Sequence, residues 1–137
     1  MLFRSPTLSE YSSLIGGCDI VIDGGANENW SLPSFHATAL GKHMVGIRAN
    51  GVAEWANDEN AILIETNGKE PCYDDRFFRP GPFSQGEFMT WDEEQFKNAM
   101  LKVLDRFNSN PINTKGLELK DKFKWSSVVD SILESFN

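Results

Sequence analysis

The sequence predicts an α/β fold in which a small parallel sheet lies between two layers of helices. Three short runs rich in aliphatic residues carry this prediction, at residues 18–23, 44–47 and 61–64. Segments with helical spacing or helix-capping residues separate and follow these runs. Strands that alternate with helices favour a parallel sheet with right-handed crossovers. The 137 residues are enough for one domain with a buried core.

Capping residues mark the first helix. Thr7-Leu8-Ser9-Glu10 has the pattern of a capping box, in which the side chains of Thr7 and Glu10 each accept a hydrogen bond from the other residue's backbone N–H. Gly16 and Gly17 are expected to end this helix. The β-branched run over residues 18–23 follows at once and predicts a strand buried on both faces.

The middle of the chain supplies a second helix and the two remaining strands. A helix is expected over about residues 33–40, because proline is tolerated in a first turn and Gly41 suits the position after the last turn. A short helix is expected over residues 51–56, with Trp55 in the core. The edge formed by residues 18–23 would remain unpaired, which natural proteins seldom allow. We therefore expect the chain to self-associate through this edge or to form part of something larger.

The C-terminal half begins with an irregular segment and continues as helices. Residues 66–89 are rich in glycine, proline and aromatic residues and are expected to form an ordered loop. A second capping box at residues 90–93 introduces a helix over about residues 92–108, whose apolar residues keep helical spacing. Two further helices are expected over residues 117–122 and 126–136. The last of them is expected to bury Val128, Val129, Ile132 and Leu133.

Composition limits the kind of partner. The net charge of −7 argues against nucleic acid or an anionic membrane as the main partner. Cys18 and Cys72 are too few for a disulfide framework and are expected to be free thiols, which suits a reducing cytosol. No apolar run approaches the roughly 20 residues of a membrane-spanning helix. We expect a soluble, cytoplasmic protein with no integral membrane segment.

The most informative stretch is residues 23–41, which lead from the first strand into the second helix. A glycine-containing loop at this position presents unpaired backbone N–H groups and the positive end of a helix dipole, which suits a diphosphate or another anion. Glu28 places a fixed charge at the mouth of this loop, and His36 lies one turn inside the helix. A nucleotide or sugar phosphate is the ligand class that this arrangement indicates. Gly24 and Gly25 are equally compatible with a simple tight turn.

With these elements in order, residues 7–136 resemble the second half of the C-terminal domain of GT-B glycosyltransferases of the large retaining type (group 1, similar to family 4). That family has a loop of the form Glu-Gly-Phe-Gly-Leu-Pro after a strand, where this chain has Glu28-Asn29-Trp30-Ser31-Leu32-Pro33. Residues 37–41 match the end of the following helix. Gly51 and Glu54 match the family's Gly-x-x-Glu, and residues 123–126 fit the start of its last helix.

The resemblance implies a donor-binding site in this loop. Glu28 would hold hydroxyl groups of the donor sugar, and the N–H groups of Ser31 and Leu32 would lie near the phosphates. His36 stands where the family has a second carboxylate, which binds the ribose. A histidine can still hydrogen-bond a ribose hydroxyl but lacks the charge-assisted contact of a carboxylate with a diol. The residues expected to bind the donor are Gly25, Glu28, Asn29, Trp30, Ser31, Leu32 and His36.

The implied reaction is transfer of a hexose from a nucleotide-diphosphate sugar to a glycan or lipid-linked acceptor, as in polysaccharide biosynthesis. It would need no cofactor and no metal, because positioning and stabilisation of the departing diphosphate carry it. The family's diphosphate-clamping Arg/Lys pair and its acceptor domain do not fit in the residues before Thr7. Residues 1–137 are therefore expected to be a partial C-terminal domain, inactive alone and without assigned catalytic residues. Its expected partner is the missing N-terminal portion or a second copy.

Other interpretations stay open. The chain could be a truncated, non-catalytic binding or assembly module. Glu28 could be a solvated charge near the helix dipole, Trp30 a packing residue before the helix, and His36 an ordinary helix histidine. The pair Asp74-Asp75 suggests a divalent metal, but no third carboxylate stands at ligand spacing, so no metal is expected. The Gly-x-Gly-x-x-Gly fingerprint of dinucleotide-binding proteins is absent from the sequence.

Overall fold

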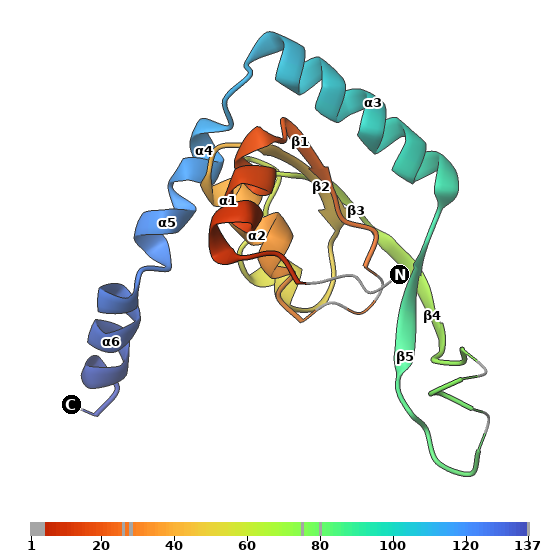
Figure 1. Cartoon of the computed structure of the whole chain (residues 1–137). Helices are drawn as coiled ribbons and strands as arrows, with labels where there is room; N and C mark the ends of the chain where they lie inside the picture. Colours follow the sequence, from red (N-terminus) through yellow and green to blue (C-terminus); the bar gives the residue numbers. More distant parts are fainter. Residues whose placement is uncertain (1–4, 26, 28, 75, 80, 137) are drawn as a thin grey trace.

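The computed structural model describes residues 5–25, 27, 29–74, 76–79 and 81–136. It confirms the predicted α/β class, with a three-stranded parallel sheet between helices (Figure 1). The elements up to the third strand are α1 (Leu8–Gly17), β1 (Ile20–Ile22), α2 (Leu32–Ala39), β2 (His43–Ile47), a 3-10 helix (Asn50–Glu54) and β3 (Ile62–Ile64). The later elements are β4 (Thr66–Pro71), β5 (Glu87–Trp91), α3 (Glu93–Ser109), α4 (Thr114–Leu117), α5 (Leu119–Lys122) and α6 (Trp125–Glu134).

The sheet has the order β1-β2-β3, so its central strand is also the second along the chain. Every residue of β2 is buried, and neighbouring residues of β2 point into different hydrophobic clusters. Met44 packs with Trp55 and with residues of α2 and α5, whereas Val45 packs with Ala99 and Val103 of α3. Because side chains alternate across a strand, β2 separates two cores and two helical layers.

Both expected caps of the first two helices are present. Thr7 and Glu10 form the capping box, with a backbone N–H to carboxylate distance of 2.8 Å in one direction and a backbone N–H to hydroxyl distance of 3.2 Å in the other. Gly41 follows α2 with a φ of +82°, a left-handed conformation that glycine adopts without strain. Trp55 is buried in the core, as predicted.

Strand β1 is shorter and more exposed than the sequence predicted. It spans three residues, and Ile22 is 52% exposed, so the strand is not buried on both faces. The reason is its place at the sheet edge, since only β2 pairs with it among the described residues. A run of β-branched residues does not distinguish a central strand from an edge strand.

The expectation of an irregular loop over residues 66–89 is wrong at both ends of that segment. Strands β4 and β5 form an antiparallel hairpin with a register shift between Thr66 and Gly68 (Figure 1). The sequence of β4, Thr-Asn-Gly-Lys-Glu-Pro, has almost no residues with high strand propensity, so cross-strand pairing with β5 decides its conformation. The predicted capping box at residues 90–93 is wrong for the same reason. Thr90 belongs to β5, and Asp92 caps α3 instead by accepting a hydrogen bond from the Gln95 N–H at 2.9 Å.

Helix α6 forms where predicted but buries none of the four side chains expected in the core. Val128, Val129, Ile132 and Leu133 are 37% to 59% exposed. Figure 1 shows α6 extending away from the sheet beyond α5, so no element of the described chain covers its apolar face. Helical periodicity predicted the helix correctly, but it does not say what the apolar face packs against.

Within the described part of the chain, no helix is both long enough and apolar enough to cross a lipid bilayer. Cys18 and Cys72 are free thiols.

The buried amide of Asn113 ties three distant segments together. Its Nδ2 donates to the carbonyl of Asn60 at 2.7 Å and to that of Lys42 at 3.1 Å, and its Oδ1 accepts from the Gly116 N–H at 2.9 Å. Asn113 is 4% exposed, so water cannot easily replace these bonds.

Replacing Asn113 with alanine should lower the free energy of unfolding by about 2–4 kcal/mol, because the carbonyls of Asn60 and Lys42 lose a buried donor and α4 loses its cap. Urea denaturation followed by circular dichroism measures the change. Asn108→Ala, an exposed asparagine of α3, serves as the control and should change stability by less than about 0.5 kcal/mol. Equal effects of the two substitutions would contradict the assigned role.

Candidate functional site

The carboxyl ends of the three parallel strands meet at one edge of the sheet. Asp23 follows β1, Arg48 follows β2 and Glu65 follows β3. In open α/β sheets ligands bind outside this edge, where loops and helix N-termini converge. We call this region the carboxyl edge.

Asp23 fastens the loop after β1 to the start of α2. One carboxylate oxygen accepts the Gly25 N–H at 3.0 Å, and the other accepts the Ser34 hydroxyl at 2.8 Å. The Ser31 hydroxyl in turn donates to the Ser34 hydroxyl at 3.1 Å. A single carboxylate therefore fixes both the glycine turn and the first turn of the helix.

The N-terminus of α2 lacks a side-chain cap. Ser31 occupies the N-cap position with φ +54° and ψ 69°, a left-handed conformation, and its hydroxyl makes no cap bond. Pro33 in the first turn has no N–H to satisfy. The N–H groups of Leu32 and Ser34 thus have no capping side chain, and an uncapped helix N-terminus attracts anions.

The segment after β2 contacts the loop after β1. A Cβ built on Gly51 would lie only 1.2 Å from the carbonyl oxygen of Asn29, so only glycine fits there. The Trp55 indole donates to the Trp30 carbonyl at 2.9 Å, and the Asn50 side chain donates to that of Asn27 at 3.3 Å. Asn29 and Trp30 are therefore held through their main-chain carbonyls, whereas Asn27 is held through its side chain.

The structure places the predicted donor-binding residues in different surroundings. Glu28 lies outside the described residues. Asn29 and Leu32 are exposed, and Ser31 is buried. The N–H of Gly25 is taken by Asp23.

The Trp30 side chain belongs to an aromatic cluster. Its ring centroid lies 5.8 Å from that of Phe35 and 5.3 Å from that of Phe123, and Trp30 packs against the core around Met44 and Trp55. These contacts suit a packing role before the helix. At the carboxyl edge Trp30 contributes only its backbone carbonyl, which accepts the hydrogen bond from the Trp55 indole.

His36 lies beside α1. Its Nδ1 is 3.0 Å from the Tyr11 hydroxyl, and both residues line a hollow of about 410 Å³ between α1, α2 and α5. The remaining walls of this hollow are mostly apolar, and include Leu8, Phe35 and Phe123. His36 therefore already has a hydrogen-bond partner within the fold.

The charge of Arg48 at the carboxyl edge is already paired. Its Nε donates to Glu65 at 2.6 Å, and its guanidinium also bonds the carboxylate of Asp58. The hydrogen bond to Glu65 is the largest cause that raises the pKa of Arg48 above its usual value, and Asp58 adds to it. Arg48 is thus committed to the protein, so an anion at the loop after β1 would be met mainly by backbone N–H groups.

Sequence reasoning missed the contributions of Asn50 and Glu65, and it gave Gly51 no structural role. The strand-end position of Glu65 was visible in the sequence, but its pairing with Arg48 depends on the register of β2 and β3. The close approach of Asn29 to Gly51 is also a tertiary contact and has no local sequence signal.

No family model matches the chain, and no curated protein matches it.

Asp74 forms a turn instead of facing a cluster of other acids. Its Oδ1 accepts the N–H groups of Arg76, Phe77 and Phe78 at 2.8–2.9 Å. Asp75 lies outside the described residues. Elsewhere in the described chain, no three His, Cys, Asp or Glu side chains are grouped as metal ligands would be.

Replacing Gly51 with alanine should lower the free energy of unfolding by at least about 2 kcal/mol, because the added methyl group displaces the Asn29 backbone. Gly17→Ala is the matched control. Nothing lies within 4 Å of the added carbon there, so this helical substitution should be neutral or stabilise by up to about 1 kcal/mol. Urea denaturation compares the two, and equal stabilities would contradict the close contact between Gly51 and the Asn29 backbone.

The pKa of Asp74 should lie below the 3.8 of a free aspartate, because the Phe78 N–H, followed by that of Arg76, stabilises the charged form. The turn is then fully bonded above that free value and loses its bonds as pH falls through the lower, folded value. Carboxyl-carbon NMR measures the pKa, and the amide signals of Arg76 and Phe78 should move with it. The amide transition should vanish in Asp74→Ala. A pKa above the free value would contradict this account.

Proposed function

We propose that this chain is the nucleotide-sugar-binding part of a retaining GT-B glycosyltransferase that transfers a hexose to a glycan or lipid-linked acceptor. The observation that carries the proposal is the construction of the carboxyl edge. An uncapped helix N-terminus is held there by Asp23 and by the Gly51 contact, and it follows the first strand as a diphosphate site requires. The motif of residues 28–33 stands in this loop.

In this proposal the protein groups have separate roles. The backbone N–H groups of Leu32 and Ser34 face the phosphates, and Asp23 keeps the Ser34 side chain and the turn at Gly25 in place. Glu28 and Asn29 contact the sugar, as the resemblance implies. His36 bonds to Tyr11 through Nδ1, which leaves Nε2 to bond a ribose hydroxyl.

In this proposal a further strand pairs with the free edge of β1. Asp19 accepts a bond from the His43 N–H, and Asp23 donates one to the Val45 carbonyl, so residues 19 and 23 face β2. Because backbone groups alternate along a strand, those of Ile20 and Ile22 face the unpaired edge. A strand added there, from an N-terminal portion or from a second copy, would place β1 inside a larger sheet. It could also supply cations to the diphosphate, since Arg48 is already paired.

A non-catalytic binding or assembly module is the alternative function. The exposed apolar face of α6 and the edge of β1 that no described residue pairs with favour it, because both surfaces suit protein contacts. It predicts stable assembly without affinity for nucleotide sugars.

Nucleotide-diphosphate sugars should shift the amide signals of Gly25, Ser34 and Asn50 in a saturable way at millimolar concentration. Asp23→Ala should weaken this binding by about tenfold or more, because it releases Gly25 and Ser34. Asp19→Ala, at the opposite end of β1, is the matched control and should leave affinity unchanged. If a panel of uridine, guanosine and adenosine diphosphate sugars shifts none of these signals, the proposed function is wrong.

A further inference from the structure

Two adjoining hollows lie beside the hairpin, next to the carboxyl edge. The first has a volume of about 400 Å³ and is lined by residues of β4, β5 and the start of α3. The second has about 330 Å³ and reaches Gly24, the second residue after β1. Trp91 and Glu93 line both hollows, so we treat them as one surface and call it the Trp91 groove.

The indole of Trp91 is a firmly supported platform. Trp91 packs against the core around Val45 and Ile64, and its ring lies 6.4 Å from that of Phe96 at an angle of 36°. Phe96 in turn lies against Gly24, since a Cβ built there would be 3.9 Å from its ring. Trp91 nevertheless remains partly exposed. A partly exposed aromatic ring that is fixed from behind loses little entropy when a ligand stacks on it.

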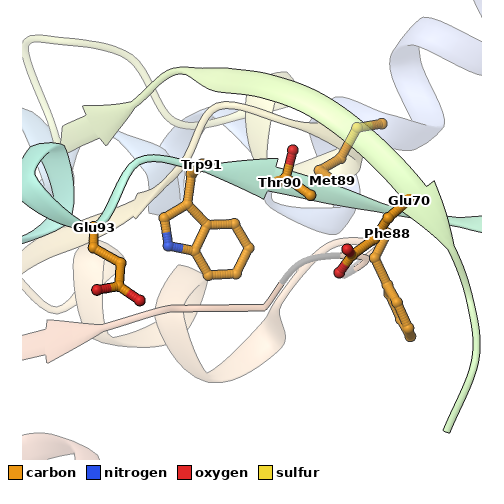
Figure 2. A pocket seen from close by; sticks show the side chains of 6 residues that line it. All are labelled: Glu70, Phe88, Met89, Thr90, Trp91 and Glu93. Carbon is orange, nitrogen blue, oxygen red and sulfur yellow. The ribbon is translucent and has the colours of Figure 1, made fainter.

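Carboxylates stand at both ends of this platform. Figure 2 shows Trp91 and Glu93 pointing to the same side of β5, while Thr90 points to the other, and Glu70 stands with its cross-strand partner Phe88 farther along. Glu70 and Glu93 are exposed, and neither has an ion pair within the described residues. The neighbouring acids, by contrast, are paired, with Glu87 near Lys69 and Glu94 bonded to Lys97.

We propose that the Trp91 groove binds a glycan, with a sugar ring stacked on Trp91 and hydroxyl groups bonded to Glu70 and Glu93. The C–H groups of a sugar ring carry slight positive charge and suit the negative face of an indole. Ionised carboxylates accept hydrogen bonds from hydroxyl groups, and sugars carry hydroxyl groups on adjacent ring carbons. A neutral polyol suits the groove better than a cationic peptide, because it uses both the aromatic face and the carboxylates, whereas a cationic side chain uses mainly the carboxylates.

The groove ends at Gly24, directly beside the Asp23–Gly25 turn. A glycan lying along β5 would therefore direct one end toward the carboxyl edge. We therefore propose that the bound glycan is the acceptor of the transfer, an assignment that rests on the proposed donor site. The proposal that the groove binds a glycan does not depend on that site.

The chain provides its own internal standard for a test. Its four tryptophans include Trp91 in the groove and Trp125, which is 84% exposed on α6. In the full chain labelled with nitrogen-15, short oligosaccharides of glucose, xylose or N-acetylglucosamine should shift the Trp91 indole signal saturably and leave that of Trp125 in place. Trp91→Phe assigns the signal while keeping an aromatic ring against the core.

Conservative variants separate binding from folding. Glu93→Gln and Glu70→Gln should each weaken glycan affinity by about tenfold, the loss expected for one charge-assisted hydrogen bond. Glu87→Gln, on β5 but outside the groove, should leave affinity unchanged, since neither Glu87 nor its partner Lys69 lines either hollow. The folded spectrum of each variant shows that the fold is intact.

Each other outcome has a definite meaning. If no oligosaccharide shifts Trp91, if Trp125 shifts equally, or if only a lysine-rich peptide binds, the glycan assignment is wrong. If glycans bind while nucleotide sugars leave Gly25, Ser34 and Asn50 unchanged, the groove is confirmed and the proposed donor site fails. If nucleotide sugars bind and glycans do not, the donor site stands and the groove proposal falls.

Discussion

The close contact between Gly51 and the Asn29 carbonyl is the constraint on which the carboxyl edge depends. It brings the segment after β2 against the loop after β1, with no room for a side chain between them. The Trp55 indole strengthens the same junction by donating to the Trp30 carbonyl. Since Trp55 is itself a core residue, the shape of the loop is coupled to the packing of the main hydrophobic cluster. Asn29 and Trp30 are thus a fixed part of the fold.

Asp23 and Asn113 act at opposite ends of this arrangement in the same way. Each is a small polar side chain whose hydrogen bonds join separate segments: Asp23 joins its own turn to Ser34 of α2, and Asn113 joins α4 to Lys42 and Asn60. Asp23 orients the start of α2 at the carboxyl edge, and Asn113 joins α4 to the turn before β2. Buried or half-buried polar groups of this kind stabilise one arrangement only, because any other leaves them without partners.

The hairpin after β3 gives the small sheet a second surface. It carries Trp91 past the end of β1, where Phe96, which itself lies against Gly24, supports the ring. The two surfaces differ in chemistry. The carboxyl edge offers backbone N–H groups, whereas the groove beside it offers an aromatic face and two carboxylates that have no ion pair with any described residue. A phosphate-bearing ligand and a polyhydroxylated one would therefore suit neighbouring positions on one domain.

The sequence by itself determined the α/β class, the three parallel strands, the helix caps at Thr7 and Gly41 and the buried position of Trp55. These features follow from local periodicity, capping chemistry and glycine conformation, which act within a few residues. Only the tertiary structure decided the hairpin, the exposure of α6 and the packing of Trp30 against Phe123. Each of these depends on whether a distant part of the chain packs against the element concerned. A polar strand such as β4 forms because β5 lies beside it, and an apolar helix face stays exposed when nothing covers it.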